Sequence, residues 1–168
     1  MSYVSVKIKS RFSNKELKEI LKNIPMVQMK VGWEKDQREE NGARTAEVAY
    51  LNEVGHYIHT KDGKSYHVVP RPFMELACEE YQRHWAQTWR RYFRQYLAGT
   101  TQSLLDAARK FCDVVINDIR YLVEVEKPFA QNKESTLRHK RALHHPETPL
   151  VDYGTMMDKL SHEIHIAR

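Results

Sequence analysis

The sequence contains few of the residues that cross-link a chain or form compact loops around a ligand. It has only two cysteines and six glycines among 168 residues. Two cysteines are too few for a disulfide framework. If the helices predicted on either side of Gly99 form a hairpin, Cys78 and Cys112 are offset by about 13 Å along the helix axis, which is beyond the reach of a disulfide. We therefore expect two buried, reduced thiols.

Long hydrophobic segments are also lacking. No apolar run approaches the roughly 20 residues needed to span a bilayer. The first ten residues alternate polar and apolar side chains and show no continuous apolar signal segment. We expect a soluble protein that is intracellular when made and has no membrane contact.

Charge is present in both signs, with only a modest basic excess. The chain has 27 lysines and arginines against 22 acidic residues, a formal net charge of +5. This balance permits an anionic partner, but it lacks the dense basic run of a dedicated nucleic-acid arm.

Catalytic motifs are missing from the sequence. The six glycines do not cluster into a phosphate-binding loop, and there is no Gly-x-Ser-x-Gly motif and no pair of cysteines at metal-binding spacing. His56, His59 and His67 could converge across a predicted hairpin, as a metal-dependent hydrolase or nuclease would require. No carboxylate or cysteine has ligand spacing beside them, so we interpret them as surface or half-buried histidines. We expect no enzyme activity, no catalytic residues, no metal and no cofactor.

The most informative stretch contains the longest predicted helix. Two prolines bracket Arg71 and keep the chain extended through it, so that it can enter a helix only at Pro72, a good first-turn residue. From Phe73 the helix can continue. No glycine or proline follows before Leu97, and Gly99 is placed to end the helix. Apolar and aromatic side chains recur at steps of three and four, which predicts one buried face. These residues are Phe73, Ala77, Tyr81, Trp85, Trp89 (or Thr88), Tyr92 and Tyr96.

A second long helix follows, capped by Thr100 or Thr101. Its apolar stripe is equally regular, and two such faces joined by a short turn predict an antiparallel helical hairpin. The stripe consists of Leu104, Ala108, Phe111, Val115, Ile119 and Leu122.

The chain before these helices alternates between strand and helix patterns. Period-two alternation predicts strands at residues 4–8 and 27–33, with a helix between them that begins at Ser13 and ends at Pro25. A short helix capped by Thr45 is expected to follow.

A β-hairpin is predicted next. The short helix ends at Gly55, and two β-prone runs at residues 56–60 and 65–69 flank an Asp-Gly turn at residues 61–64.

The last part of the chain is less regular. Residues 126–148 show little periodicity and are predicted to form an extended loop or flexible arm. Residues 149–154 then lead into a helical turn at 156–160 and a strand at 162–166. We expect an α+β fold in a single domain of residues 1–168: a small, mostly antiparallel sheet packed against two long helices, with a β-hairpin and a flexible arm.

Four arginines of the first long helix lie mainly outside its apolar face. Arginines mixed with aromatic side chains can bind phosphate and stack on bases, so a DNA contact is one interpretation of this face. The other is a solvated or subunit-facing surface, which we favour. The arginines are Arg83, Arg90, Arg91 and Arg94.

Two segments of the chain together carry a distinctive set of residues. The first segment contains Asn52, Glu53, Gly55, Pro70, Arg71, Pro72 and Phe73, and the second contains Pro128, Asn132, Ser135, Thr136, Lys140, Pro149, Leu150, Asp152 and Gly154. The first is similar to A-x-x-N-E-(F/V)-G followed by P-x-R-P-F, and the second to P…N…S-T…K…P-L-(I/V)-D-T-G. These patterns resemble the signature of the tail-completion proteins of tailed bacteriophages, which are also called neck or head–tail joining proteins. Tyr153 departs from the pattern, because the family usually has threonine at that place.

The resemblance implies a structural role in the virion. Proteins of this family join the portal–connector end of a filled capsid to the tail tube, so the expected partners are connector and tail-tube proteins. The resemblance also implies a homo-oligomeric ring, located in the virion and, during assembly, in the host cytoplasm. The motif residues would then fix helices and loops rather than perform chemistry. The alternative function is that of a basic, DNA-binding accessory protein.

Overall fold

A computed structural model of the protein describes residues 22, 24–100, 103–126, 128–151 and 155–167. The strand expected at residues 4–8 and the start of the helix expected after Ser13 lie outside these residues. The chain divides into two compact units, residues 29–164 and residues 1–28 with 165–168. The expectation of one domain therefore stays a prediction, and the larger unit contains all the sites described below.

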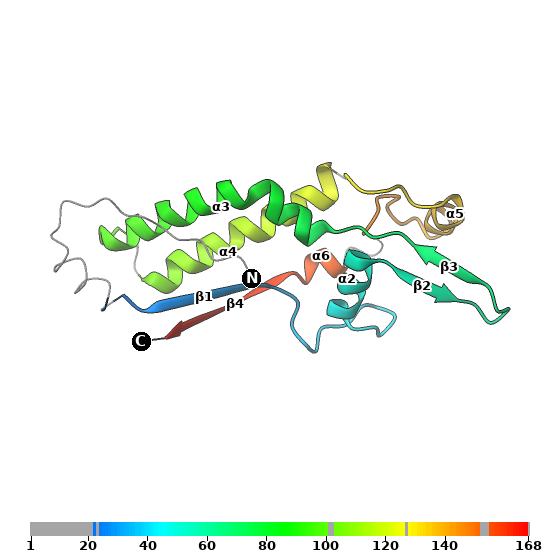
Figure 1. Ribbon diagram of the computed structural model, residues 1–168, viewed down its shortest axis with the longest axis horizontal. Helices are drawn as coiled ribbons and strands as arrows, with labels where there is room; N and C mark the ends of the chain where they lie inside the picture. The colour runs from blue at the N-terminus through cyan, green and yellow to red at the C-terminus, as the bar shows by residue number, and fades with distance from the viewer. Residues whose placement is uncertain (1–21, 23, 101–102, 127, 152–154, 168) are drawn as a thin grey trace. The chain divides into compact units, whose positions relative to one another are not determined.

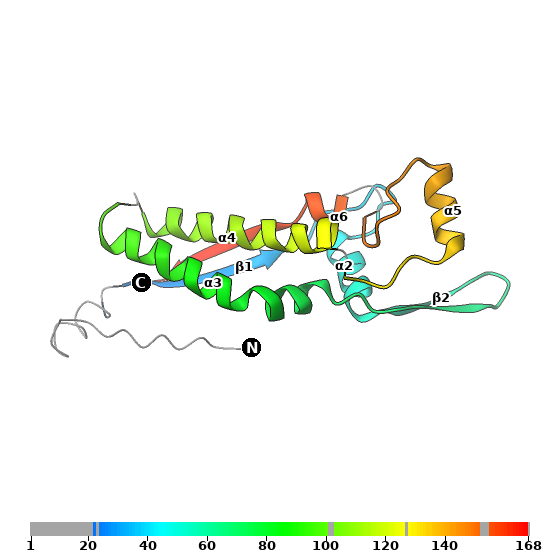
Figure 2. The same ribbon diagram turned by 90° about the horizontal axis from the view of Figure 1, so that it is seen from above.

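Two long helices form the hairpin that the sequence predicts. Helix α3 spans Phe73–Leu97 and helix α4 spans Leu104–Tyr121. They lie side by side in both views (Figures 1 and 2) and pack against each other. Gly99 has a φ of 70° in the turn between them, a backbone conformation that glycine adopts without steric cost.

The cap of α4 differs from the prediction. The N-cap is Ser103, whose hydroxyl oxygen accepts a hydrogen bond from the Asp106 backbone N–H at 3.1 Å. The Thr100 hydroxyl instead donates to the carbonyl oxygen of Gln95, at the end of α3. The N–H groups in the first turn of α4 have no carbonyl acceptor within the helix, and the Ser103 oxygen supplies an acceptor for one of them. The helix continues as a π-helix, η1, over Leu122–Glu126.

The core forms where the predicted apolar stripes meet. Phe73, Ile119 and Leu122 are almost fully buried, together with smaller residues of both helices. The Trp85 indole N–H donates to Asp118 of α4 at 2.8 Å, which satisfies this polar group at the helix interface.

The two cysteines differ from each other. Both thiols are free, and Cys112 is buried as expected, but Cys78 is exposed. It follows the buried Ala77 by one residue, and one residue rotates a side chain by about 100° around the helix axis. The expectation of two buried thiols was wrong because it relied on residue type rather than on helical position.

The strands form two small antiparallel sheets. Strand β1 (Met26–Gly32) pairs with β4 (Ser161–Ala167), and β2 (His56–His59) pairs with β3 (Ser65–Val68). The two long helices pack against a sheet, with Val31 and Trp33 in contact with the core. The predicted α+β fold class is confirmed.

Three short helices complete the described fold: α2 (Thr45–Val54), α5 (Glu134–Ala142) and α6 (Thr155–Asp158). Thr45 was predicted as the N-cap of α2, but it is the first helical residue, and Arg44 occupies the cap position.

The segment predicted as an extended loop or arm, residues 126–148, contains helix α5. This helix lacks an apolar stripe and depends on polar contacts beyond its own ends. Arg141 forms an ion pair with Glu147 at 2.7 Å, and the buried Lys140 donates to carbonyl groups that follow the helix. Hydrophobic periodicity therefore missed it.

Candidate functional site

The first motif segment joins α2 to α3 through one carboxylate. Glu53 accepts hydrogen bonds from the backbone N–H groups of Met74, at 3.0 Å, and Glu75, at 2.9 Å. These N–H groups belong to the first turn of α3, where no intrahelical acceptor exists and a negative charge is favoured by the helix dipole. Glu53 thus serves as a cap supplied by a different helix.

Gly55 and Asn52 fix the same connection. Gly55 has φ 73° and ψ 164°, and a Cβ built there would lie 2.8 Å from the carbonyl oxygen of Val68 and 2.9 Å from Pro70. The Asn52 amide donates to the Val48 carbonyl, and the Asn52 carbonyl accepts from the Arg71 N–H at 2.8 Å. The two ends of the hairpin are therefore held together at its base.

Arg71 links the first motif segment to the second. Its side chain is only 8% exposed. Its Nε donates to the Ala130 carbonyl at 3.2 Å and its Nη2 donates to Asn132 Oδ1 at 3.1 Å. The Asn132 amide in turn donates to the Glu147 carbonyl. Burial lowers the pKa of Arg71 because desolvation disfavours the charged form.

Phe73 forms the buried end of this connection. It is fully buried and packs edge-to-face against Trp33, with ring centroids 6.0 Å apart. The Trp33 indole N–H donates to the Met156 carbonyl at 2.6 Å, so the residue that follows strand β1 joins helix α6 at the start of α3. An edge-to-face pair of this kind stabilises the fold by about 1 kcal/mol beyond the contribution of the apolar area that it buries.

The second motif segment is held by a buried lysine. Lys140 is 6% exposed, and its ammonium group donates to the carbonyl oxygens of Pro146, Thr148 and Val151. Pro149 is buried next to them, and Leu150 adopts a positive φ of 66°. Asp152 and Gly154 of the motif lie outside the described residues.

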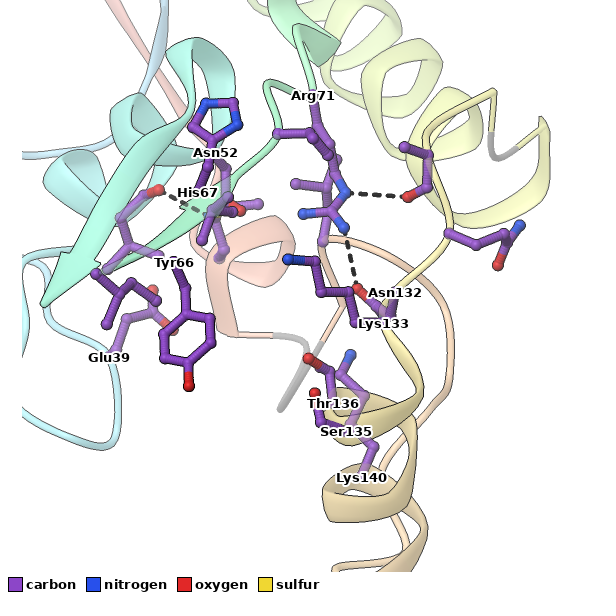
Figure 3. Close-up of a pocket in the computed structure, with 18 of the residues that line it drawn as sticks. Glu39, Asn52, Tyr66, His67, Arg71, Asn132, Lys133, Ser135, Thr136 and Lys140 are labelled. Carbon is purple, nitrogen blue, oxygen red and sulfur yellow. Dashed lines mark hydrogen bonds between the residues drawn. The ribbon is translucent and has the colours of Figure 1, made fainter. Parts of the chain in front are cut away.

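A pocket of about 890 Å³ opens between these elements. Figure 3 shows Arg71 between hairpin residues Tyr66 and His67 on one side and the segment from Asn132 to Lys140 on the other. The sequence does not reveal this pocket, because its walls come from segments about 60 residues apart. The other residues used below that line it are Glu39, Ile58, Val68, Val69, Lys133, Ser135, Thr136, Leu150 and Met156.

The β2–β3 hairpin presents large side chains to solvent. It extends away from α2 and α3 in Figures 1 and 2. Tyr57 is 65% exposed, and Ile58 and Tyr66 are about half exposed. An exposed apolar group of this kind on a projecting element is typical of an interaction surface.

The three hairpin histidines take separate partners. His56 Nδ1 lies 3.2 Å from the Leu51 carbonyl, His59 Nδ1 lies 2.8 Å from the Ser65 hydroxyl, and His67 stacks on Tyr57. In the part of the chain that the structure describes, no group of three or more histidine, cysteine, aspartate or glutamate side chains could hold a metal ion.

The four arginines of α3 are exposed. Arg83, Arg90 and Arg94 are spaced by seven and four residues, which aligns them on one stripe of the helix. Arg91 lies beside this stripe, with its guanidinium carbon 5.1 Å from the centroid of the Tyr92 ring.

None of the described helices is both long and apolar enough to span a membrane.

Comparisons with protein-family models, curated proteins and solved structures found no match to this chain.

Proposed function

We propose that the protein is a virion structural component that joins the head and tail of a tailed bacteriophage. The observation that supports this proposal is the physical role of the motif residues. Glu53, Gly55, Arg71 and Lys140 each tie one backbone segment to another. The resemblance implies residues of this kind, which determine a shape rather than a reaction.

The projecting elements supply contact surfaces for the proposed partners. The hairpin exposes Tyr57, Ile58 and Tyr66, and its base is fixed at Asn52 and Gly55. A rigid base reduces the entropy that is lost when an exposed element docks on a neighbour. We propose that the hairpin contacts the connector, the tail tube or an adjacent copy in a ring.

Light scattering combined with small-angle X-ray scattering tests this proposal at low and moderate salt. We expect either a discrete closed oligomer or a monomer that forms rings when tail-tube protein is added. A monomer that remains unchanged with both connector and tail-tube proteins contradicts the proposal.

A DNA-binding accessory protein is the second candidate, because the arginine stripe on α3 is exposed. Arg83, Arg90 and Arg94 span about 16 Å along the helix, and they would contact phosphates without reading sequence. This function predicts duplex binding that weakens steeply with salt and is lost when the four arginines become glutamine. Salt-independent or absent binding excludes it.

A further inference from the structure

The pocket beside the hairpin contains a buried cation with neutral partners. The two acceptors that Arg71 contacts are a backbone carbonyl and an amide oxygen. Among the described residues, no carboxylate lies within salt-bridge distance of its guanidinium group. A guanidinium group has five N–H donors, so Arg71 retains donors beyond these two bonds. A buried charge of this kind is strongly stabilised by an anion.

The wall next to Arg71 adds three features that favour an anion. Lys133 lines the pocket and is also the N-cap residue of α5, a helix of nine residues. No side chain caps this helix end, so backbone N–H groups and the positive end of the helix dipole remain available. Ser135 and Thr136 place hydroxyl groups on the same wall, as Figure 3 shows.

The rest of the pocket lining favours a ligand that also carries hydrogen-bond donors and apolar groups. Glu39 Oε1 is buried and has no hydrogen-bond partner among the described residues, so it needs a donor. A fully ionised phosphate group or a phosphodiester offers acceptors only, so it cannot supply this donor. Apolar side chains form another part of the lining, and these include Ile58, Val68, Val69, Leu150 and Met156.

A polypeptide satisfies all these requirements at once. It offers carboxylates for the cationic wall, N–H donors for Glu39 and aliphatic side chains for the apolar lining. Among the described strands, β3 pairs only with β2, which leaves its second edge open to an extended segment. We propose that this pocket binds an acidic, extended segment of a partner polypeptide, with one carboxylate between Arg71 and Lys133.

This binding is testable in the isolated protein, independently of the role at the head–tail joint. The probe is an acetylated, amidated pentapeptide of alternating valine and glutamate, titrated to 5 mM while ¹H–¹⁵N spectra are recorded. Its neutral counterpart replaces both glutamates with glutamine. We expect saturable shifts at the Arg71 Nε–H, the Asn132 amide and Val68 with the acidic peptide, and affinity at least about tenfold lower with the neutral one.

Variants locate the charge that the peptide recognises. Lys133→Gln removes an exposed cation of the pocket and is expected to weaken binding about fivefold. Lys110→Gln removes an exposed lysine of α4 outside the pocket and is expected to leave the affinity unchanged. Arg71→Gln is expected to abolish binding, and its spectrum shows whether the fold has survived.

Three results overturn the proposal. These are the absence of saturable shifts at 5 mM, equal binding of the neutral peptide, and displacement of the acidic peptide by inorganic phosphate or duplex DNA at lower concentration. None of them affects the test of oligomerisation, so the two proposals fail separately.

Discussion

Glu53, the penultimate residue of α2, caps the first turn of α3 by accepting a hydrogen bond from the Met74 N–H at 3.0 Å. Its other oxygen accepts from the Glu75 N–H at 2.9 Å. The cap and the capped helix are thus about 20 residues apart in the sequence, with the whole β2–β3 hairpin between them. One carboxylate therefore stabilises α3 and closes the base of the hairpin.

Replacing Glu53 by alanine is expected to lower the free energy of unfolding by about 1–2 kcal/mol, because two N–H groups of α3 lose their acceptor. Urea denaturation followed by circular dichroism measures this change. The control is Glu79→Ala, an exposed position on α3 that is expected to change stability by less than about 0.5 kcal/mol. Equal effects of the two variants would show that the Glu53 cap contributes nothing of its own.

Gly55→Ala is expected to destabilise the protein by more than about 2 kcal/mol. The backbone at Gly55 has a conformation reserved for glycine, and the added Cβ would approach the Val68 carbonyl to 2.8 Å. Gly42→Ala is the matched control, because Gly42 also has a positive φ but no atom within 4 Å of the added Cβ. Thermal unfolding of both variants separates the clash from the backbone strain, and a smaller loss at Gly55 than at Gly42 contradicts this interpretation.

Lys140→Met is expected to destabilise the protein by about 2–4 kcal/mol. The ammonium group donates to three carbonyls of residues 146–151, and methionine would leave these acceptors buried without a donor. Hydrogen exchange of the α5 amides should rise by at least tenfold in this variant. Lys133→Met replaces an exposed lysine of the same segment, and comparable exchange in the two variants would disprove the role of the buried ammonium.

The two thiols are expected to react very differently with an alkylating reagent. Cys78 is exposed and should be modified in the folded protein, whereas burial raises the pKa of Cys112 to about 11 and blocks access. Desolvation and the nearby Glu53 charge raise the pKa of Cys78, so its thiolate fraction at pH 8 is lower than that of a free cysteine. The alkylation rate of Cys78 should therefore increase as the pH is raised above 8. Glu53→Gln removes the nearby negative charge and should increase this rate at a given pH. Mass spectrometry after timed alkylation measures both sites, and modification of Cys112 before unfolding contradicts the prediction.

Helix and strand positions that depend on local chemistry were predictable from the sequence. The predicted helical run from Phe73 to Leu97 is confirmed in α3, because proline and glycine act on their own neighbours in the chain. Pro72, which was expected in the first helical turn, is the N-cap residue instead. Helix α5 was not predictable in the same way, since Lys140 stabilises it through carbonyls that lie after the helix.

The candidate pocket could not be predicted from the sequence either, because it also depends on contacts between distant segments of the chain. Arg71 was recognised as a motif residue, but its partners Ala130 and Asn132 are about 60 residues away. The burial of Arg71 and the unpartnered oxygen of Glu39 arise only when these segments fold together. Sequence patterns report the period of an element, whereas the pocket depends on which elements become neighbours.

Electron microscopy of particles assembled without this protein tests its proposed role most directly. The coding sequence would be deleted from the genome that carries it, and the protein supplied in trans as a control. The account predicts filled heads and complete tails that remain unjoined, with joining restored by the intact protein but not by a variant lacking residues 61–64 of the hairpin. Normally joined, infectious particles in the deletion strain would contradict it.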